Sequence, residues 1–141
     1  RQAVCSPEEV VTTLRFRVAD TTVPVPVLAR LRQLTSLSIS EIRSRAVAGE
    51  AIFEITPFQS DWQTRRTTLV QVAHEIADGS LPLKITELHA DRESAVSLQM
   101  LKNLIEQFRQ IEVESQKDTM LELGEISDPA EFISYDQDWT Q

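Results

Sequence analysis

The apolar residues of this chain switch repeatedly between the spacing of a strand and the spacing of a helix, and this switching limits the fold more than any other feature. Residues 14–18 alternate apolar and basic side chains, as a half-buried strand does. Residues 27–34 repeat apolar side chains every three or four positions, which is the period of a helix packed on one side. A chain of 141 residues is long enough to bury a real core. We therefore expect a single mixed α/β domain over residues 1–141.

Residues that begin and end helices divide the rest of the chain into elements. Ser6-Pro7 predicts the start of a short helix over about 7–12. The elements expected after it are a strand at 14–18, helices at 27–34 and 38–49, a strand at 51–55, a helix that opens at Ser60 or Asp61 and ends at Gly79, and a strand at 81–88.

The C-terminal third is expected to begin with a long helix over 91–115, in which Asp91 is the cap. Residues 116–141 then form an acidic segment that also carries aromatic side chains. Within this segment, residues 120–123 predict a short strand or turn. Residues 127–131 predict a one-turn helix.

Over residues 13–88 the elements follow the order strand, helix, helix, strand, helix, strand. We expect them to form a sheet of three to four strands with helices mainly on one face. Within this range, residues 27–43 read VLARLRQLTSLSISEIR. In this order and in the apolar rhythm of that stretch, the chain resembles the C-terminal domain of the bacterial ribosomal stalk protein, which has a β-α-α-β-α-β fold. The residue types shared with that family are Arg32, Thr35, Leu37 and Glu41.

The resemblance implies that a helical hairpin over 27–48 is a surface for translation factors. The exposed lysines of the family fall on Ala29, Ser40 and Arg43 here, so only Arg43 keeps a positive charge. The turn glycine of the family is Ser36 here. The resemblance thus implies the fold and, as an alternative function, an adaptor or ribosome-associated role for the hairpin.

The net charge of −8 lies wholly in the last 30 residues. Residues 112–141 hold nine acidic side chains and one basic side chain, whereas residues 1–111 hold 13 of each. Such a field attracts cationic partners and repels nucleic acid and anionic membranes. A tail that only keeps a protein in solution is poor in large apolar residues, but this one is not. We therefore expect it to fold onto the body or onto a partner.

The expected partner-binding residues are the acids of this segment and the aromatic side chains among them, because aromatic residues often anchor interfaces. They are Asp118, Glu122, Glu125, Asp128, Glu131, Phe132, Tyr135, Asp136, Asp138 and Trp139. For Trp139 three alternatives are open: it docks back onto the body, it belongs to a partner interface, or it lies in a disordered end. Trp62, near a helix start, is expected in the core.

Other groups of reactive residues lack the spacing that a site requires. His74, His89 and Cys5 are too far apart in sequence for a recognisable zinc pattern, so we expect no metal site. Arg65 and Arg66, at a helix start, suit either an anion or a solvated helix face. Arg15 and Arg17 are candidates for a basic strip on the outer face of the first strand. We predict no catalytic residue and no cofactor.

The sequence therefore favours a non-enzymatic protein that binds a basic protein. The most concrete hypothesis is a bacterial immunity protein, an inhibitor that neutralises a basic toxin such as a nuclease. The alternatives are the hairpin adaptor and a small enzyme with an unrecognised site. The single cysteine, the missing signal pattern and the lack of an apolar run of about 20 residues predict a cytoplasmic protein without membrane or nucleic-acid partners. The oligomeric state stays open.

Overall fold

The computed structural model describes residues 12–140, and its contacts divide the chain into two compact units that meet between Leu98 and Gln99. We call the described residues 12–98 the N-terminal unit and residues 99–140 the C-terminal unit. Cys5 and most of the helix predicted at 7–12 lie outside the described residues, and Thr12 belongs to a strand.

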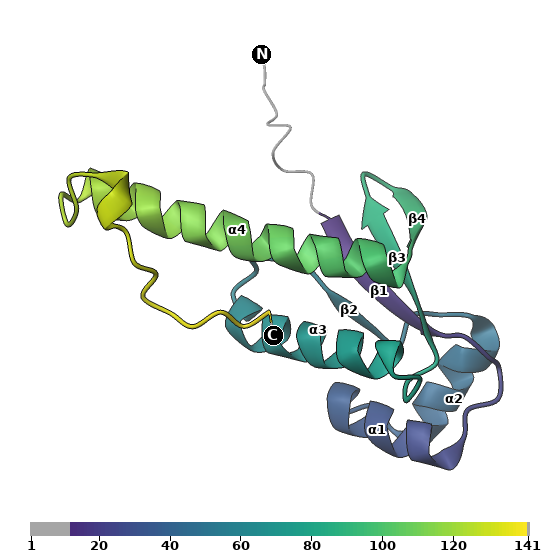
Figure 1. Ribbon diagram of the computed structural model, residues 1–141. Helices are drawn as coiled ribbons and strands as arrows, with labels where there is room; N and C mark the ends of the chain where they lie inside the picture. Colours follow the sequence, from purple (N-terminus) through teal and green to yellow (C-terminus); the bar gives the residue numbers. More distant parts are fainter. Residues whose placement is uncertain (1–11, 141) are drawn as a thin grey trace. The chain divides into compact units, whose positions relative to one another are not determined.

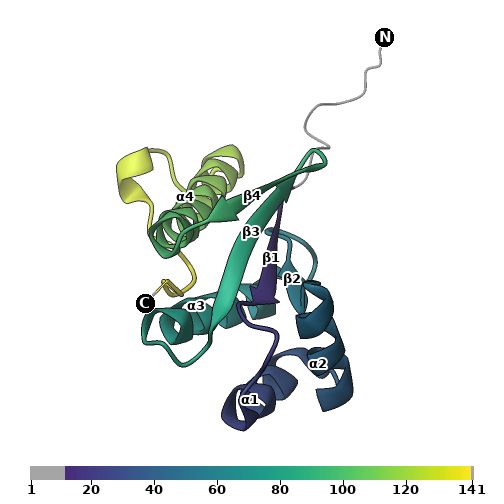
Figure 2. The same cartoon turned by 90° about the vertical axis from the view of Figure 1, so that its right-hand side faces the viewer.

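The N-terminal unit is a four-stranded antiparallel sheet with three helices (Figure 1). Its elements are β1 (Thr12–Val18), α1 (Val25–Thr35), α2 (Ile39–Ala48), β2 (Phe53–Ile55), α3 (Trp62–Ala77), β3 (Leu83–His89) and β4 (Arg92–Val96). The strand order β2-β1-β3-β4 can be followed in Figure 2. The mixed α/β fold class predicted from the sequence is confirmed, and the element order up to β3 is the predicted one.

The alternation of β1 decides which face of the sheet is buried. Leu14, Phe16 and Val18 point into the core, while Arg15 and Arg17 between them point to the opposite face. The ring of Phe16 stacks on the ring of the β2 residue Phe53, with centroids 4.5 Å apart. The helices complete this core with Val27, Leu28, Leu31, Ile42, Ala46, Trp62, Leu69, Val70, Val72 and Ala73.

The hairpin of α1 and α2 has the start and stop signals that the sequence predicted. The Ser38 hydroxyl oxygen accepts a hydrogen bond from the Glu41 backbone N–H at 3.1 Å, and Gly49 ends α2 with φ 72°. Ser36, where the stalk family has glycine, ends α1 in the left-handed conformation with φ 62°. The backbone therefore adopts at Ser36 the geometry that glycine adopts most easily.

The helix predicted from Asp91 was wrong at its start. Ala90 and Asp91 both have positive φ, 51° and 66°, as the two central residues of a type I′ hairpin turn do. They join β3 to β4, with His89 opposite Arg92. The outer edge strand β4 is almost wholly exposed, so its sequence carries no alternation of apolar residues that could have predicted a strand.

The C-terminal unit consists of a long helix and a tail. Helix α4 spans Leu98–Glu122, so the short strand or turn predicted at 120–123 was wrong, and Gly124 with φ 75° follows the helix end. The buried side chains of α4 are Leu101, Ile105, Phe108 and Gln116. A 3₁₀ helix at Pro129–Glu131 confirms the predicted one-turn helix, and Asp128 caps it.

The two valines Val72 and Val47 offer a matched test of the core. Val72 on α3 is 0% exposed, whereas Val47 on α2 is 69% exposed. We expect Val72→Ala to lower the free energy of unfolding by about 2–3 kcal/mol, because it removes two buried methyl groups and leaves a cavity. We expect Val47→Ala to change it by less than about 0.5 kcal/mol. Urea denaturation followed by circular dichroism measures both, and equal losses would contradict this core.

Candidate functional site

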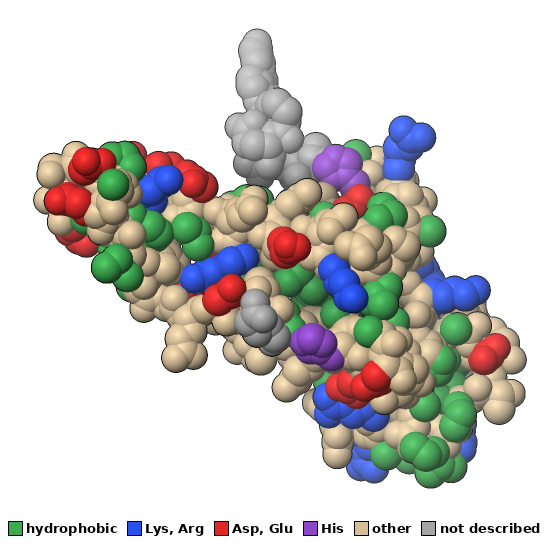
Figure 3. Space-filling view, viewed as in Figure 1, with side chains coloured by type: hydrophobic (Ala, Val, Ile, Leu, Met, Phe, Trp, Pro, Cys, Tyr) green, Lys and Arg blue, Asp and Glu red, His purple; other side chains and the backbone are tan. Residues whose placement is uncertain are grey.

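The C-terminal unit carries far more acidic than basic side chains. Residues 99–140 hold ten acids against three bases, a net of −7, whereas residues 12–98 hold ten of each. Figure 3 shows the acidic side chains gathered at the end of α4 and over the 3₁₀ turn. Lys117 pairs with Glu114 at 3.0 Å, and Arg109 pairs with Glu112 at 3.2 Å and with Asp136 at 3.0 Å. Most of the charge therefore has no cation to neutralise it within this unit.

Three of the predicted partner-binding acids are exposed at this end of α4. Asp118, Glu122 and Glu125 have no hydrogen-bond or ion-pair partner for their side chains among residues 12–140. Asp118 and Glu122 follow Glu114 at four-residue intervals, so the three carboxylates lie on one face of the helix. They line a shallow hollow of about 670 Å³, in which Ile111 is the apolar residue. This face presents a row of negative charge beside one exposed apolar side chain.

The tail returns along α4, and we call residues 132–140 the strap. The Asp136 carboxylate accepts hydrogen bonds from Arg109 at 3.0 Å, from Gln116 at 2.9 Å and from the Ser134 hydroxyl at 2.8 Å. Burial by itself would raise the pKa of Asp136, but these hydrogen bonds outweigh it and lower the pKa to about 2. Asp136 therefore holds the strap on the helix and is itself half-buried.

Trp139 also docks within the C-terminal unit. Its indole Nε1–H donates a hydrogen bond to Oε1 of Glu112 at 2.7 Å, and the same oxygen accepts from Arg109 at 3.2 Å. The Glu112 and Arg109 side chains are only 10% and 12% exposed. Of the three alternatives open for Trp139, the structure has the one in which this residue folds back onto the chain.

The remaining predicted acids bind groups close to them in sequence. Glu131 accepts from the backbone N–H groups of Ser127 and Asp128, and these bonds lower the pKa of Glu131. Asp128 accepts from the Ala130 N–H, and Asp138 accepts from the Thr140 N–H and hydroxyl. Of the predicted aromatic residues other than Trp139, Phe132 is half-buried and Tyr135 is exposed.

Leu123 and Ile133 are the most exposed of the large apolar residues of this unit that were absent from the predicted partner-binding residues. Leu123 is 68% exposed at the end of α4, and Ile133 is 81% exposed in the strap. Gly124 was the available signal for Leu123, because a glycine directly after a helical pattern marks the helix end. Ile133 has no signal in the sequence that separates it from a core residue.

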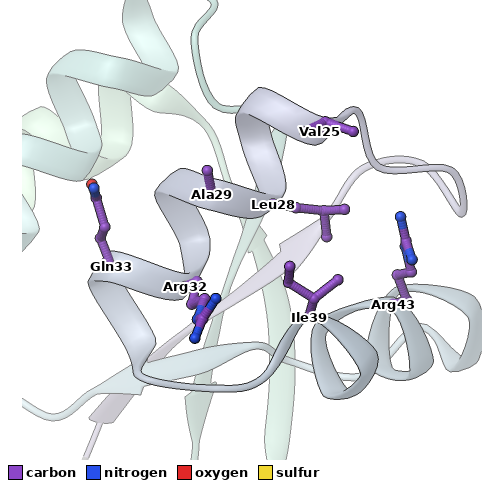
Figure 4. Close-up of a pocket in the computed structure, with 7 residues that line it drawn as sticks. All are labelled: Val25, Leu28, Ala29, Arg32, Gln33, Ile39 and Arg43. Carbon is purple, nitrogen blue, oxygen red and sulfur yellow. The ribbon is translucent and has the colours of Figure 1, made fainter.

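A second exposed surface lies in the N-terminal unit, between α1 and α2 (Figure 4). It is a groove of about 520 Å³ whose apolar lining is Val25, Leu28, Ala29 and Ile39. Leu28 and Ile39 point toward one another across it, and Arg32 and Arg43 lie on either side of them, with Gln33 farther along α1. Neither arginine has a hydrogen-bond or ion-pair partner for its side chain among the described residues.

The other hairpin arginines are engaged within the unit. Arg30 donates to Glu75 at 2.8 Å, and Arg45 donates to Glu41 at 3.2 Å and to the Ala51 carbonyl at 3.1 Å. Arg32 and Arg43, on opposite sides of the groove, are therefore the hairpin cations that an incoming acidic group would meet.

The outer face of the sheet is a mixed network of charges. Arg15 and Arg17 do share this face, as the alternation predicted. Arg15 pairs with Glu54 at 2.9 Å, and both arginines pair with Glu93. The bonds from Arg17 and Thr86 lower the pKa of Glu93. The face therefore balances its own charge and is not a basic strip.

The other candidate residues have structural neighbours. Trp62 is buried in the core, Arg65 pairs with Asp61 at 3.1 Å, and the His89 ring shares a hydrogen bond with Thr12 at 2.7 Å. Residues 12–140 contain no group of three or more acidic, histidine or cysteine side chains that could hold a metal ion. No helix in the same range is both long enough and apolar enough to cross a membrane.

Comparison with protein-family models, with curated protein sequences and with solved structures found no match. The two exposed surfaces, one acidic and one apolar with flanking arginines, therefore carry the functional argument by themselves.

We expect the strap to detach from α4 in the variant Asp136→Asn and, in the unmodified chain, at low pH. Because the pKa of Asp136 is about 2 in the folded unit and 3.8 ordinarily, its stabilising effect is present above about pH 4 and is lost as the pH falls toward 2. The Trp139 indole N–H resonance in ¹⁵N NMR reports the docked strap. We expect it to shift and to exchange faster in Asp136→Asn at pH 7, and to shift in the unmodified chain below pH 3.

Asp118→Asn is the matched control for this experiment, because the Asp118 carboxylate has no hydrogen-bond partner among residues 12–140. It should leave the Trp139 resonance unchanged at pH 7. An unchanged resonance in Asp136→Asn would contradict the role assigned to Asp136.

Proposed function

We propose that this chain is a non-enzymatic protein-binding protein whose acidic C-terminal unit binds a basic protein. The single observation that carries the proposal is the set of exposed carboxylates without partners among residues 12–140, Asp118, Glu122 and Glu125, beside the exposed apolar side chains Ile111 and Leu123. Uncompensated charge speeds the encounter with an oppositely charged partner, and apolar residues beside it supply the buried contact.

The most concrete form of this function is a bacterial immunity protein that inhibits a basic toxin such as a nuclease. A nuclease needs a positive cleft for its substrate, because nucleic-acid affinity is dominated by contacts to phosphate. A rigid row of carboxylates competes for such a cleft by the same electrostatic attraction. The proposed inhibitor therefore covers the substrate-binding surface of the toxin without any chemistry of its own.

The strap supports this proposal by fixing the shape of the acidic unit before any partner arrives. Asp136 and Trp139 tie the strap to α4 through three side chains of that helix: Arg109, Gln116 and Glu112. A surface that is already ordered loses less conformational entropy on binding than a free tail does. Asp136 and Trp139 thus act through the shape of the surface, and the exposed acids act through contact.

The triple variant Asp118→Asn/Glu122→Gln/Glu125→Gln tests the proposed surface. Immobilised full-length chain captures partners at low salt from cells of the organism that makes it, and a salt gradient elutes them. We expect a basic partner of the unmodified chain to elute at modest salt. We expect the triple variant to bind this partner about tenfold more weakly, since exposed ion pairs contribute only tenths of a kcal/mol to about 1 kcal/mol each.

A matched control separates local contact from total charge. Asp20→Asn/Glu50→Gln/Glu87→Gln changes the net charge equally but lies in the N-terminal unit, where these side chains have no partner among the described residues. It should keep nearly full affinity. A partner that is not basic, or that the acidic triple variant retains at full affinity, would contradict the proposal. Point variants are preferable to deleting 119–141, because the deletion would also uncover Arg109 and Gln116.

The α1–α2 groove favours one second candidate function, an adaptor or ribosome-associated protein that binds through the hairpin. Its apolar lining between Arg32 and Arg43 suits a partner helix with acidic flanks. Under this function the captured partner is retained by the acidic triple variant and lost by Arg32→Glu/Arg43→Glu. Arg30 and Arg45 are unsuitable for this test, because their reversal also breaks pairs with Glu75 and Glu41.

A further inference from the structure

The α1–α2 groove has the features of a receptor for one apolar side chain between two carboxylates. Val25 and Ile39 supply its exposed apolar surface above the buried Leu28. Arg32 and Arg43 line the same groove without partners among the described residues (Figure 4). An arginine beside an apolar contact favours a carboxylate over any other side chain. The occupant of this groove should therefore present an exposed aliphatic residue with an acidic residue close on each side.

The end of α4 presents that combination, and we call residues 122–125 the α4 tip. Leu123 is 68% exposed and lies between the exposed side chains of Glu122 and Glu125. Backbone hydrogen bonds fix the turn, from the Leu123 N–H to Thr119 O and from the Glu125 N–H to Met120 O, each at 2.9 Å. Leu123 is therefore held outward on a defined turn.

The helix itself adds negative potential at the same place. The last turn of α4 contains no basic residue, so nothing there offsets the negative end of the helix dipole. Glu122 and Glu125 add two carboxylates to this end, and neither has a partner among residues 12–140. The α4 tip and the groove are thus opposite in charge, and each has an exposed apolar part.

We propose that the α4 tip of one copy of this chain docks in the α1–α2 groove of a second copy. Leu123 packs against Val25 and Ile39 of the second copy, and the carboxylates of Glu122 and Glu125 face its two groove arginines. This contact needs no basic partner from outside, although it uses Glu122 and Glu125, which also belong to the proposed binding surface.

The contact joins two different surfaces, so it is head-to-tail. Each copy contributes a tip to one neighbour and a groove to another, so the contact continues into short chains or closes into a ring. The two surfaces are small compared with the roughly 1,600 Å² of a standard stable interface. We therefore expect weak self-association, visible between about 10 µM and 1 mM and suppressed by salt.

Sedimentation velocity on the full-length chain tests this contact. The weight-average sedimentation coefficient should rise with concentration at low salt and should fall back in about 0.5 M salt, where charges are screened within a few ångströms. Arg32→Glu/Arg43→Glu and Glu122→Arg/Glu125→Arg should each abolish the rise. The quadruple variant that carries all four changes exchanges the charges at an unchanged net charge, and it should associate again.

Two further variants control for charge and for exposed apolar surface. Lys84→Glu/Arg92→Glu changes the net charge as much as the groove variant, at exposed positions outside the groove, and should associate like the unmodified chain. Leu123→Gln should abolish association, whereas Ile133→Gln, at the more exposed isoleucine of the strap, should leave it intact.

Several outcomes would overturn the proposal. They are a monomeric chain over the whole concentration range, association that survives either charge-reversed pair, and a quadruple variant that fails to recover. If the groove and the tip contact each other within a monomer, the contact lies within one chain, and this result would also overturn the proposal. The groove variant keeps every carboxylate of the C-terminal unit, so failure of self-association and failure of the proposed function are measured separately.

Discussion

The shortage of cations decides which surface the C-terminal unit presents. It has three basic side chains for ten acidic ones. Arg109 is taken by Glu112 and Asp136, and Lys117 is taken by Glu114. The acids of the 3₁₀ turn and of the strap end bind backbone N–H groups and hydroxyls near them. Within the C-terminal unit, the carboxylates without partners among residues 12–140 are Glu106, Asp118, Glu122 and Glu125, and three of these four lie at the end of α4.

Arg109 is half-buried, and its pairing with Asp136 has a second consequence, because it holds the strap on α4. Asp136 joins Arg109 and Gln116 across 27 and 20 residues of sequence, and Trp139 reaches Glu112 across another 27. Removing one member of a hydrogen-bonded, partly buried charge pair leaves the other unpaired, and this is costly. The cluster of Arg109, Glu112 and Asp136 thus neutralises part of the negative charge of this unit. The same cluster fixes the conformation of the strap, while the other carboxylates stay exposed.

The sequence predicted most of the elements because their signals are local. The alternation around Phe16, the cap at Ser38 and the stop at Gly49 each need only a few neighbouring residues. β4 was missed because an exposed edge strand has no apolar period, and its turn uses Ala90-Asp91 where Asn-Gly is the usual signal. The acidic segment was found from composition, but which of its acids are exposed depends on contacts across about 20 residues and more, which no local pattern contains.

The exposed carboxylates of the α4 end are the proposed contact surface for a basic protein. Zero-length carbodiimide cross-linking tests it most directly, because this reagent joins a carboxylate only to a lysine amine in contact with it. The account predicts that partner lysines in complexes formed at low salt become linked to Asp118, Glu122 or Glu125. Partner lysines linked instead to carboxylates of the N-terminal unit, such as Asp20 or Glu50, or partner carboxylates linked to Lys84, would contradict it.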